Sequence, residues 1–536
     1  MSHSEYYLQY ILDKMPVLLT QVDRDEDSPT FGSCDRNYWH LKIRDFSSAI
    51  LQQAGLAIAL VNKINFKNNI YYGKEQLETW SKATLYFWKN IQLRDGSFNE
   101  YYPNEHGFPP TAFSLFAVCE TYKILKLNDI ELEKAFARTS KYLVNHIEPK
   151  AYNQEIASIT ALYSAYTILE EEWIKEGIEK KLIRILELQS EEGWFSEYGG
   201  ADIGYLSVSY DMLAEYYWMS KDERVLLALT KLTNFVKYFV HPDKTIGGEY
   251  GSRNTIYFLP NGLEVMTCLE NKDAIVVKNF LYNKNAYFMN SIDDRYNSHY
   301  IVHSYLRALK KELEFNKDKN VNYLDELPLK KSKKKYFEKS GLISYHTNMY
   351  SCYIALKKGG VIKIFNKTNE IYIDCGYRFK DGNKIAMTNW QDDLYEISFS
   401  NNTATVEGKF NMIKLHVSSP IKHFILRIAS FTFGNKIIGQ LKKMIILNDR
   451  HIKGSYFKRV IELKENTIII KDSITLDKKR IIYLAPTSSL RHVASGKFFQ
   501  TSELLGEHKR LIEAKSLSRT VKINIESGKI DENIYE

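Results

Sequence analysis

The hydrophobic pattern of this 536-residue chain changes its period once, and this change constrains the fold more than any other feature. Up to about residue 315, apolar residues recur at helical spacing, as Ile159, Leu162 and Tyr166 do. Beyond about residue 340 the period is two, as in 359–366 and in the hairpin candidate 456–476. We therefore predict helices in the first part of the chain and strands in the second.

Three loops of the helical part resemble one another. They are IQLRDGSFNEYYP (91–103), LELQSEEGWFSEYGG (186–200) and VHPDKTIGGEYGS (240–252), with a weaker copy, NHIEPKAYNQE (145–155), between the first two. Each unit is a helix, a loop with glycine and aromatic residues, and a second helix. A repeat of about 50 residues indicates an array of helix pairs. We expect the array to close into an (α/α) toroid whose loops gather at one end around a cleft; an open solenoid is the alternative.

The segment 316–340 is polar and highly charged and contains Pro328, which is typical of a connection. We therefore divide the chain into an (α/α) toroid catalytic domain (1–315), a linker (316–340) and an antiparallel β-sandwich (341–536).

Composition limits the function. The net charge of +8 comes from widely spread lysines, so no nucleic-acid partner is expected. The five cysteines form no CxxC pair, which argues against a disulfide framework and a zinc site; we expect no metal and no cofactor. No stretch is apolar enough to span a membrane, and no secretory signal is evident, so a cytoplasmic location is expected. The 38 tyrosines suit a sugar-binding surface.

A toroid followed by a β-sandwich resembles the heparinase II/III-like polysaccharide lyases and their chondroitin- and alginate-lyase relatives. The resemblance rests on NEHGFPP (104–110), EYGGADIGY (197–205), GGEYGSRNT (247–255) and FKRVIELKENTIIIKDSI (457–474). It implies a carbon–oxygen lyase that cleaves a uronic-acid-containing polysaccharide by β-elimination. The substrate would be an acidic polysaccharide or oligosaccharide.

β-Elimination requires a group that neutralises the uronate carboxylate, a base for the C5 proton and an acid for the departing oxygen on C4. The resemblance implies Asn or Arg for the first role and Tyr and His for the others. The candidate catalytic residues are Asn104, His106, Tyr205 and Arg253. The alternatives are a plain turn for Asn104 and His106, packing at a helix start for Tyr205 and a surface position for Arg253.

A second set of residues is expected to bind substrate. It consists of Tyr250, Asn254, Trp39, Arg36, Trp194 and His303. Tyr250 is also an alternative base. His299 and His303 have the spacing of metal ligands on a helix, but no third ligand accompanies them.

Other functions remain open on the same scaffold. A glycoside hydrolase needs two opposed carboxylates. The loop candidates for them are Glu100, Glu105, Glu197, Asp202 and Glu249. A uronyl epimerase, or a non-catalytic sugar-binding protein of surface-polysaccharide (exopolysaccharide) assembly, are further alternatives.

Overall fold

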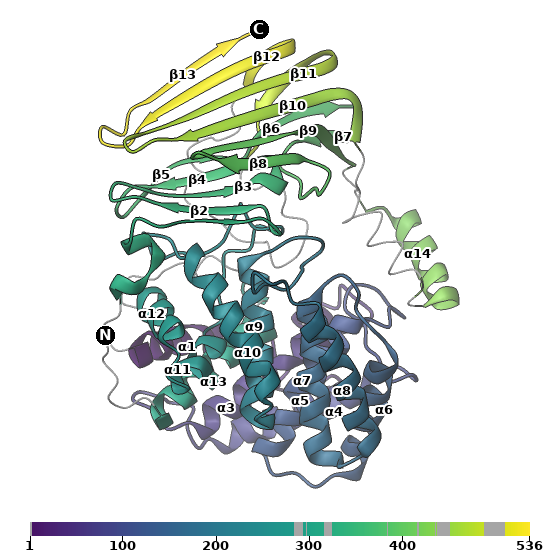
Figure 1. Cartoon of the computed structure of the whole chain (residues 1–536). Coiled ribbons are helices and arrows are strands. Elements are labelled where there is room, and N and C mark those ends of the chain that lie inside the picture. Colours follow the sequence, from purple (N-terminus) through teal and green to yellow (C-terminus); the bar gives the residue numbers. More distant parts are fainter. Residues whose placement is uncertain are drawn as a thin grey trace.

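The computed structural model describes residues 3–282, 293–295, 297–315, 324–382, 384–414, 418–434, 436, 451–486 and 510–536. A helical part comes first and a β part follows it, as the change of hydrophobic period predicts (Figure 1). The last helix of the first part ends at Phe315, and the first strand, β1 (Lys334–Phe337), begins inside the segment expected to be a linker. It pairs with β2 (Leu342–His346), so part of that segment belongs to a sheet.

Six helices form a closed ring of contacts. They are α3 (Ala54–Lys63), α5 (Phe108–Ile124), α7 (Tyr152–Leu169), α9 (Ile203–Ser220), α11 (Pro260–Cys268) and α13 (Val302–Phe315). Each contacts the next in this order, and α13 contacts α3. Helices α5, α7 and α9 are buried on nearly every side, which is expected of helices inside a ring.

Amphipathic helices lie between these in the sequence and cover the ring. They are α4 (Glu75–Asn90), α6 (Ile130–Asn145), α8 (Glu172–Glu187), α10 (Glu223–Val236) and α12 (Lys272–Leu281). In addition, α1 (His3–Leu19) packs on α13, α2 (Arg36–Trp39) is a single turn, and a short π-helical segment (Asn297–Ile301) precedes α13.

The repeated loops share a backbone geometry. Gly32, Gly96 and Gly193 all have positive φ, and a Cβ on any of them would lie 2.2–2.3 Å from a carbonyl group of α4, α6 or α10, respectively. Only glycine permits this close approach. Gln92 and Gln189, each four residues before its glycine, donate from Nε2 to carbonyls of α6 and α10 at 2.8 and 2.9 Å. The Q-x-x-x-G pattern thus fixes each loop to the next helix pair.

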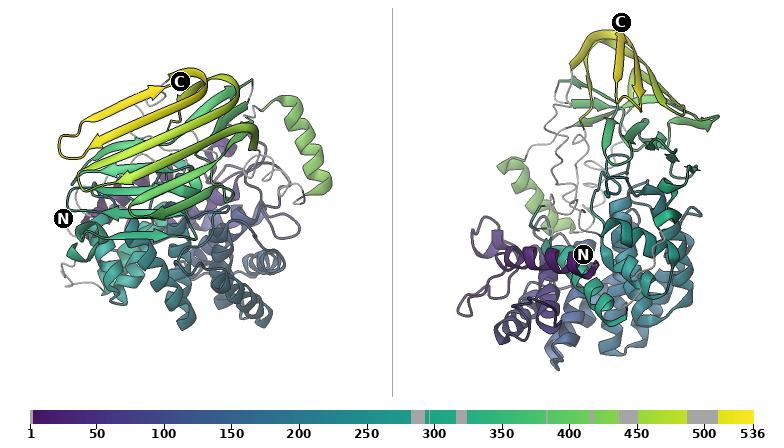
Figure 2. Two further views of the ribbon diagram at one scale, coloured as in Figure 1. Left: turned by 45° about the horizontal axis from the view of Figure 1, so that its top comes forward. Right: turned by 90° about the vertical axis from the view of Figure 1, so that its left-hand side faces the viewer.

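The β part contains two antiparallel sheets (Figure 2). The five-stranded sheet has the order β1–β2–β3–β4–β5, with β3 at Ser351–Ala355, β4 at Val361–Phe365 and β5 at Glu370–Asp374. The eight-stranded sheet comprises β6 (Tyr377–Asp381), β7 (Lys384–Met387), β8 (Glu396–Ser400), β9 (Thr403–Lys414), β10 (His451–Leu463), β11 (Thr467–Leu484), β12 (Arg510–Asn524) and β13 (Ile530–Tyr535). The predicted hairpin is confirmed: Phe457 pairs with Ile474 and Leu463 with Ile468.

The three central strands of the five-stranded sheet are buried on both faces. Every residue of β2, β3 and β4 is buried. Alternate residues, such as Tyr353 and Phe365, belong to the hydrophobic core of the helical part. Their neighbours, such as Ile354 and Ile364, share a second core with the eight-stranded sheet. This sheet is therefore the middle layer of the molecule.

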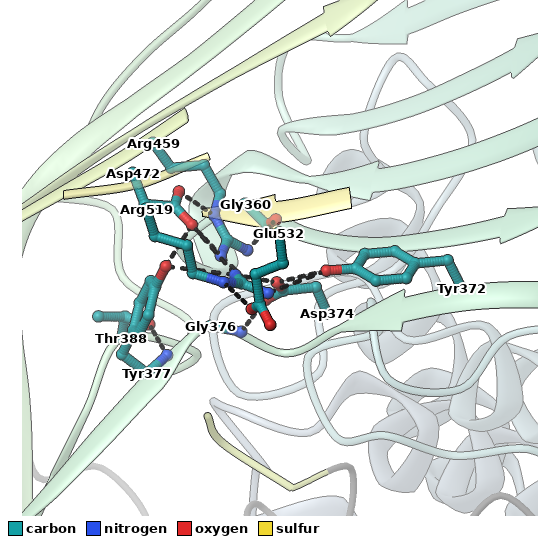
Figure 3. Close-up of polar contacts among 10 residues, drawn as sticks. All are labelled: Gly360, Tyr372, Asp374, Gly376, Tyr377, Thr388, Arg459, Asp472, Arg519 and Glu532. Atoms are coloured by element: carbon teal, nitrogen blue, oxygen red, sulfur yellow. Dashed lines mark hydrogen bonds and ion pairs between the residues drawn. The ribbon is translucent and has the colours of Figure 1, made fainter. Parts of the chain in front are cut away.

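A fully paired ionic cluster joins the two sheets (Figure 3). Arg459 contacts Asp472 at 2.7 Å and Asp374 at 2.9 Å, and Arg519 contacts Asp374 at 2.7 Å and Glu532 at 2.7 Å. Both arginines are 1–2% exposed. Because each buried charge has an opposite partner, the cluster is a cross-link within the β part.

One helix of the β part stands apart from both sheets. Helix α14 (Pro420–Phe433) lies beside the helical part, to the right of the body in Figure 1. Its Arg427 pairs with Asp45 of the helical part at 2.5 and 2.7 Å. Among the described residues, no helix has the length and apolar content that a membrane crossing requires.

Candidate active site

One carboxylate ties together two of the predicted catalytic residues. Asp202 caps the N-terminus of α9, where its Oδ1 accepts the backbone N–H of Tyr205 at 3.0 Å. Its Oδ2 accepts the backbone N–H of Arg253 at 2.8 Å. The second and third repeat loops are therefore held side by side, and Tyr205 and Arg253 belong to one local structure.

The guanidinium of Arg253 is buried, and two of its nitrogen donors make no hydrogen bond to the described residues. The side chain is 7% exposed and lies over the ring of Tyr198, 4.7 Å from its centroid. Its Nε and Nη2 find no hydrogen-bond partner among the described residues. These are adjacent donors on one edge of the guanidinium, which is the edge that binds a carboxylate through two hydrogen bonds. An unused buried donor costs about 1–3 kcal/mol, so the arrangement favours a ligand or water there.

Tyr205 is the first member of a chain of tyrosine contacts. The rings of Tyr205 and Tyr257 meet edge to face with centroids 6.4 Å apart, and the hydroxyls of Tyr257 and Tyr300 are 2.9 Å apart. The neighbouring Glu100 carboxylate raises the pKa of Tyr101 well above its ordinary value, and Tyr205 adds to the effect. Burial raises the pKa of Tyr300, so its hydroxyl keeps its proton at neutral pH. Tyr205 therefore lies among protonated phenols.

The loop carboxylates divide into two groups. Asp202 caps a helix, Glu105 accepts the N–H groups of residues 100 and 101, and Glu249 pairs with buried Lys363 at 3.0 Å; all three are structural. Glu100 and Glu197 instead act on Tyr300: burial raises its pKa, and the charges of these two carboxylates raise it further.

Glu197 is a buried carboxyl that favours its neutral form. It is 0% exposed. Burial raises its pKa well above the ordinary value, against the opposing effects of the Asn153 N–H, which it accepts at 2.8 Å, and of Arg253. Its Oε2 finds no hydrogen-bond partner among the described residues. Glu197 can therefore hold a proton next to Arg253.

Asn104 and His106 directly follow the first repeat loop, and both have positive φ. The Nδ1 of His106 is 2.6 Å from Asp95 Oδ2 and 2.9 Å from Ser97 Oγ, and its carbonyl accepts the Tyr142 hydroxyl at 2.6 Å. None of these contacts of His106 involves Tyr205 or Arg253. These contacts tie His106 to its own loop and to α6.

Three predicted binding residues pack against the β part instead. Tyr250 is 1% exposed; its hydroxyl is 2.8 Å from His241 Nε2, and its ring stacks on Tyr353. Asn254 is 2% exposed and accepts a hydrogen bond from Lys358. Trp194 donates to Glu192, which in turn accepts two backbone N–H groups of the β part. The hydroxyl of Tyr250 is therefore engaged by groups inside the protein.

The remaining predicted residues occupy separate places. His303 is 1% exposed, with its Nε2 3.2 Å from Gln53, and burial lowers its pKa well below the ordinary value. Trp39 donates to the carbonyl of residue 21 at 2.9 Å, and Arg36 is exposed on the single turn of α2. No described contact brings His303, Trp39 or Arg36 to Arg253.

Tyr101 and Tyr198 are not among the residues predicted for the site, although the sequence contains a signal for them. The three repeat loops each contain the dipeptide Glu-Tyr: Glu100-Tyr101, Glu197-Tyr198 and Glu249-Tyr250. In the first two, the pair lies by Tyr300 or Arg253; in the third, it is buried against the β part. Aligning the repeats would have placed Tyr101 and Tyr198 beside the candidate site. Tyr257 and Tyr300 carry no comparable motif.

A separate hollow of about 570 Å³ lies on the β part, over strands β8 to β11. Tyr456, Glu407 and Lys458 line it, and the two charged residues pair at 2.8 Å. It contains none of the predicted catalytic residues.

Comparison with solved structures identifies the architecture. The chondroitin AC lyase of Streptomyces coelicolor A3, solved with chondroitin sulphate, superimposes with a TM-score of 0.55 at 8% identity, covering 90% of this chain and 67% of that chain. A heparinase III gives 0.46 at 12% identity, covering 90% and 79%. Another heparinase III, with methylated lysines, gives 0.42 at 9% identity, covering 81% and 64%. This chain thus spans about two thirds of the length of the first and last of these proteins.

No protein-family model matches the sequence, and a search of curated proteins finds no relative. The likeness therefore lies in three-dimensional structure. On the strength of the chondroitin AC lyase superposition, which spans the helical and β parts together, this chain has a heparinase/chondroitinase-like lyase fold.

Proposed function

We propose that this protein cleaves a uronic-acid-containing polysaccharide by β-elimination at the site around Asp202. The observation that carries the proposal is that Asp202 binds the backbone N–H groups of both Tyr205 and Arg253, and that Arg253 Nε and Nη2 have no partner among the described residues. The lyase-like fold supports it. The substrate is acidic, because a buried cation with unused donors needs an anion.

β-Elimination needs carboxylate binding, proton removal and proton donation, and residues of this site can perform each of them. Arg253 binds the uronate carboxylate and withdraws charge from C5. Tyr205 acts as base or acid: as base, its phenolate takes the C5 proton while the C4–O bond breaks and a C4=C5 double bond forms. The departing oxygen then needs a proton, which the Tyr257–Tyr300 hydroxyl pair or Tyr101 can supply. A nearby positive charge lowers the pKa of a tyrosine, so the phenolate that acts as base forms more easily.

Access to Arg253 requires movement of a loop. The unused donors are closed off from solvent, and Tyr198 covers the guanidinium. Tyr198 and Gly199 both have positive φ, and Gly200 follows them. We infer that this glycine-rich loop opens to admit substrate. His106 and Asn104 line the substrate path from the first repeat loop in this proposal.

We also propose that the helical part is a toroid and the β part a β-sandwich. The ring of six helices is the (α/α) toroid of residues 1–315, and the two stacked sheets form a β-sandwich over 341–536, to which β1 adds the end of the segment 316–340 that was expected to be a linker. The thiols of Cys34, Cys119 and Cys352 are buried and form no disulfide among the described residues, which favours a reducing compartment, so we propose action in the cytoplasm on an exopolysaccharide or its oligosaccharides.

The test is incubation of the full chain with a panel of uronate-containing polysaccharides, including chondroitin sulphate and alginate. New ultraviolet absorbance from an unsaturated uronate is the expected result. The Tyr163→Phe variant serves as a matched control, because Tyr163 lies on α7 among Tyr166 and Tyr216, and should keep full activity. Absence of unsaturated product on every polymer would contradict the proposal.

A glycoside hydrolase is the second candidate, because Glu100 and Glu197 both raise the pKa of Tyr300 and burial favours the protonated form of Glu197. A protonated and an ionised carboxyl are what such an enzyme requires. It would release reducing ends without an unsaturated product, and Glu100→Gln would abolish that release. A uronyl epimerase would change the sugar configuration without cleavage, and a sugar-binding protein would bind the polymer without change.

A further inference from the structure

Helix α14 exposes an unusually apolar surface. Its large apolar side chains are Ile421 (72% exposed), Phe424 (65%), Ile425 (60%), Ile428 (54%), Phe431 (82%) and Phe433 (60%). A folded monomer rarely leaves so many large apolar groups together in water, and a patch of this kind marks an interaction surface. The described remainder of the chain does not cover it.

The exposed residues form one stripe. Ile421, Phe424, Ile425, Ile428 and Phe431 follow the i, i+3, i+4, i+7 spacing that places side chains on one helical face. The opposite side faces the body of the protein, since Ser430 is 1% exposed. The stripe is therefore a face directed outward, not the result of an irregular helix.

The ionisable residues of α14 are all of basic type, and one of them, Arg427, pairs with Asp45 of the helical part. Within Pro420–Phe433 the ionisable residues are Lys422, His423 and Arg427, and no acidic residue occurs. Lys422 and Arg427 lie on opposite flanks of the stripe in a helical projection. An apolar face bordered by basic residues is the pattern of helices that lie in the interface of a membrane.

The length of the helix decides between crossing a bilayer and lying on it. Fourteen residues span about 21 Å, while the hydrocarbon core measures about 30 Å. The charged side chains of Lys422 and Arg427 also make insertion across the core unfavourable. The helix can therefore only lie parallel to the surface.

We propose that α14 docks this protein on the surface of an anionic lipid bilayer, with the stripe Ile421–Phe431 inserted among the acyl chains. The positive flanks commit the surface to lipid phosphate rather than to a neutral partner, since each basic residue near an anionic surface strengthens binding about fivefold. This inference does not depend on the proposed lyase activity.

Docking would orient the rest of the molecule. Arg427 pairs with Asp45 of the helical part, and a Cβ on Gly434, the residue after α14, would lie 3.3 Å from the His106 ring. The bound helix therefore holds the first repeat loop next to the membrane. A polymer attached to a lipid, or leaving the membrane, would meet this side of the protein first.

The experiment is co-sedimentation of the full chain with vesicles of phosphatidylglycerol and phosphatidylcholine, and with vesicles of phosphatidylcholine alone. We expect binding to the anionic vesicles that weakens as salt is added. The double substitution Phe424→Ser and Ile428→Ser should weaken binding at least about tenfold, because two inserted apolar side chains are lost. Lys422→Gln should weaken it by about fivefold at low salt.

A matched double variant controls for general loss of surface hydrophobicity. Ile130→Ser with Leu227→Ser removes two residues of equal exposure, 61% and 62%, from the helical part, and should bind as the unchanged protein does. Equal thermal unfolding temperatures establish that all variants fold.

Three results would overturn the proposal. The first is a failure of the unchanged protein to sediment with anionic vesicles. The second is equal binding by the α14 double variant. The third is a dimer in light scattering that the double variant converts to a monomer, since a second copy of the chain would then cover the stripe.

Discussion

Two buried arginines of this protein are used in opposite ways. Arg459, in the β part, has carboxylates on both sides, Asp472 and Asp374. Arg253, in the helical part, is nearly as buried, yet two of its nitrogens have no partner among the described residues. Both sites bury the same cation, so burial does not distinguish them. The difference is whether the folded chain itself supplies the anion.

This contrast separates stability from function. A buried charge that is fully paired holds elements together, and its loss leaves the partner charges exposed to a low-dielectric environment. A buried charge with open donors contributes less to the fold and keeps its capacity for a ligand. The two arginines should therefore respond differently to the same substitution.

The largest effect is expected for Arg459→Ala. The change leaves Asp374 and Asp472 without their shared cation, which should lower the free energy of unfolding by about 3–5 kcal/mol. Denaturant titration followed by circular dichroism measures it. The exposed ion pair of Arg224 with Glu179 gives the control: Arg224→Ala should cost less than about 1 kcal/mol. Equal losses in the two variants would remove the distinction.

Tyr205→Phe should lower lyase activity by about 100-fold or more, because it removes only the hydroxyl that transfers the proton. The ring contact with Tyr257 survives, so the unfolding free energy should stay close to that of the unchanged protein. Initial rates of unsaturated-uronate formation and a denaturant titration are both needed. Full activity in Tyr205→Phe would transfer the base role to another tyrosine of the site, with Tyr101 the next to test.

Arg253→Ala should weaken binding of the acidic substrate by about 10- to 100-fold, since a charge-assisted hydrogen-bonding partner is lost. Its effect on stability should be smaller than that of Arg459→Ala. Arg253→Lys keeps the charge but not the paired donors, so it should recover only part of the affinity. Substrate-concentration series for both variants provide the measurement. A loss of stability as large as that of Arg459→Ala would show that Arg253 is a structural residue.

The smallest effect concerns pH. Burial raises the pKa of Glu197, whereas the Arg459 and Arg519 guanidinium groups hold the pKa of Asp374 well below its usual value despite burial. A raised carboxyl pKa gives stability that is present below the ordinary value of 4.5 and is lost as pH rises. Glu197→Gln should therefore gain stability relative to the unchanged protein as pH rises above 4.5. Unfolding titrations at pH 4, 6 and 8 measure the difference in unfolding free energy between Glu197→Gln and the unchanged protein. If this difference did not change with pH, Glu197 would be ionised like a surface carboxylate, and the prediction would be wrong.

The sequence predicted the order of the two parts because apolar periodicity is a local property. It also indicated the repeat, since Gln92, Gly96 and their counterparts Gln189 and Gly193 recur with the same spacing. The double burial of the five-stranded sheet was not predictable in this way. Its strands β2 to β4 are buried on both faces, so alternation indicates a strand but not a second neighbour.

The candidate site was only partly accessible to sequence reasoning. Tyr205 and Arg253 follow glycine-rich loops, and the structure holds them together through Asp202. Tyr250 has a similar local sequence, yet its ring lies against Tyr353, more than 100 positions later in the chain. Long-range packing of this kind decides whether a loop aromatic faces substrate or another layer, and no local pattern reports it.

The double-faced sheet has a consequence for how this molecule can be divided. Strands β1 to β5 complete the core of the helices, so a fragment that ends at Phe315 would present the apolar groups that Tyr353 and Phe365 now cover. The smallest fragment that keeps the helices covered on this side ends after Asp374. Recombination between relatives would preserve both cores best if it exchanged the helices together with this sheet, with the crossover placed near Gly376 and not at the helix-to-strand junction.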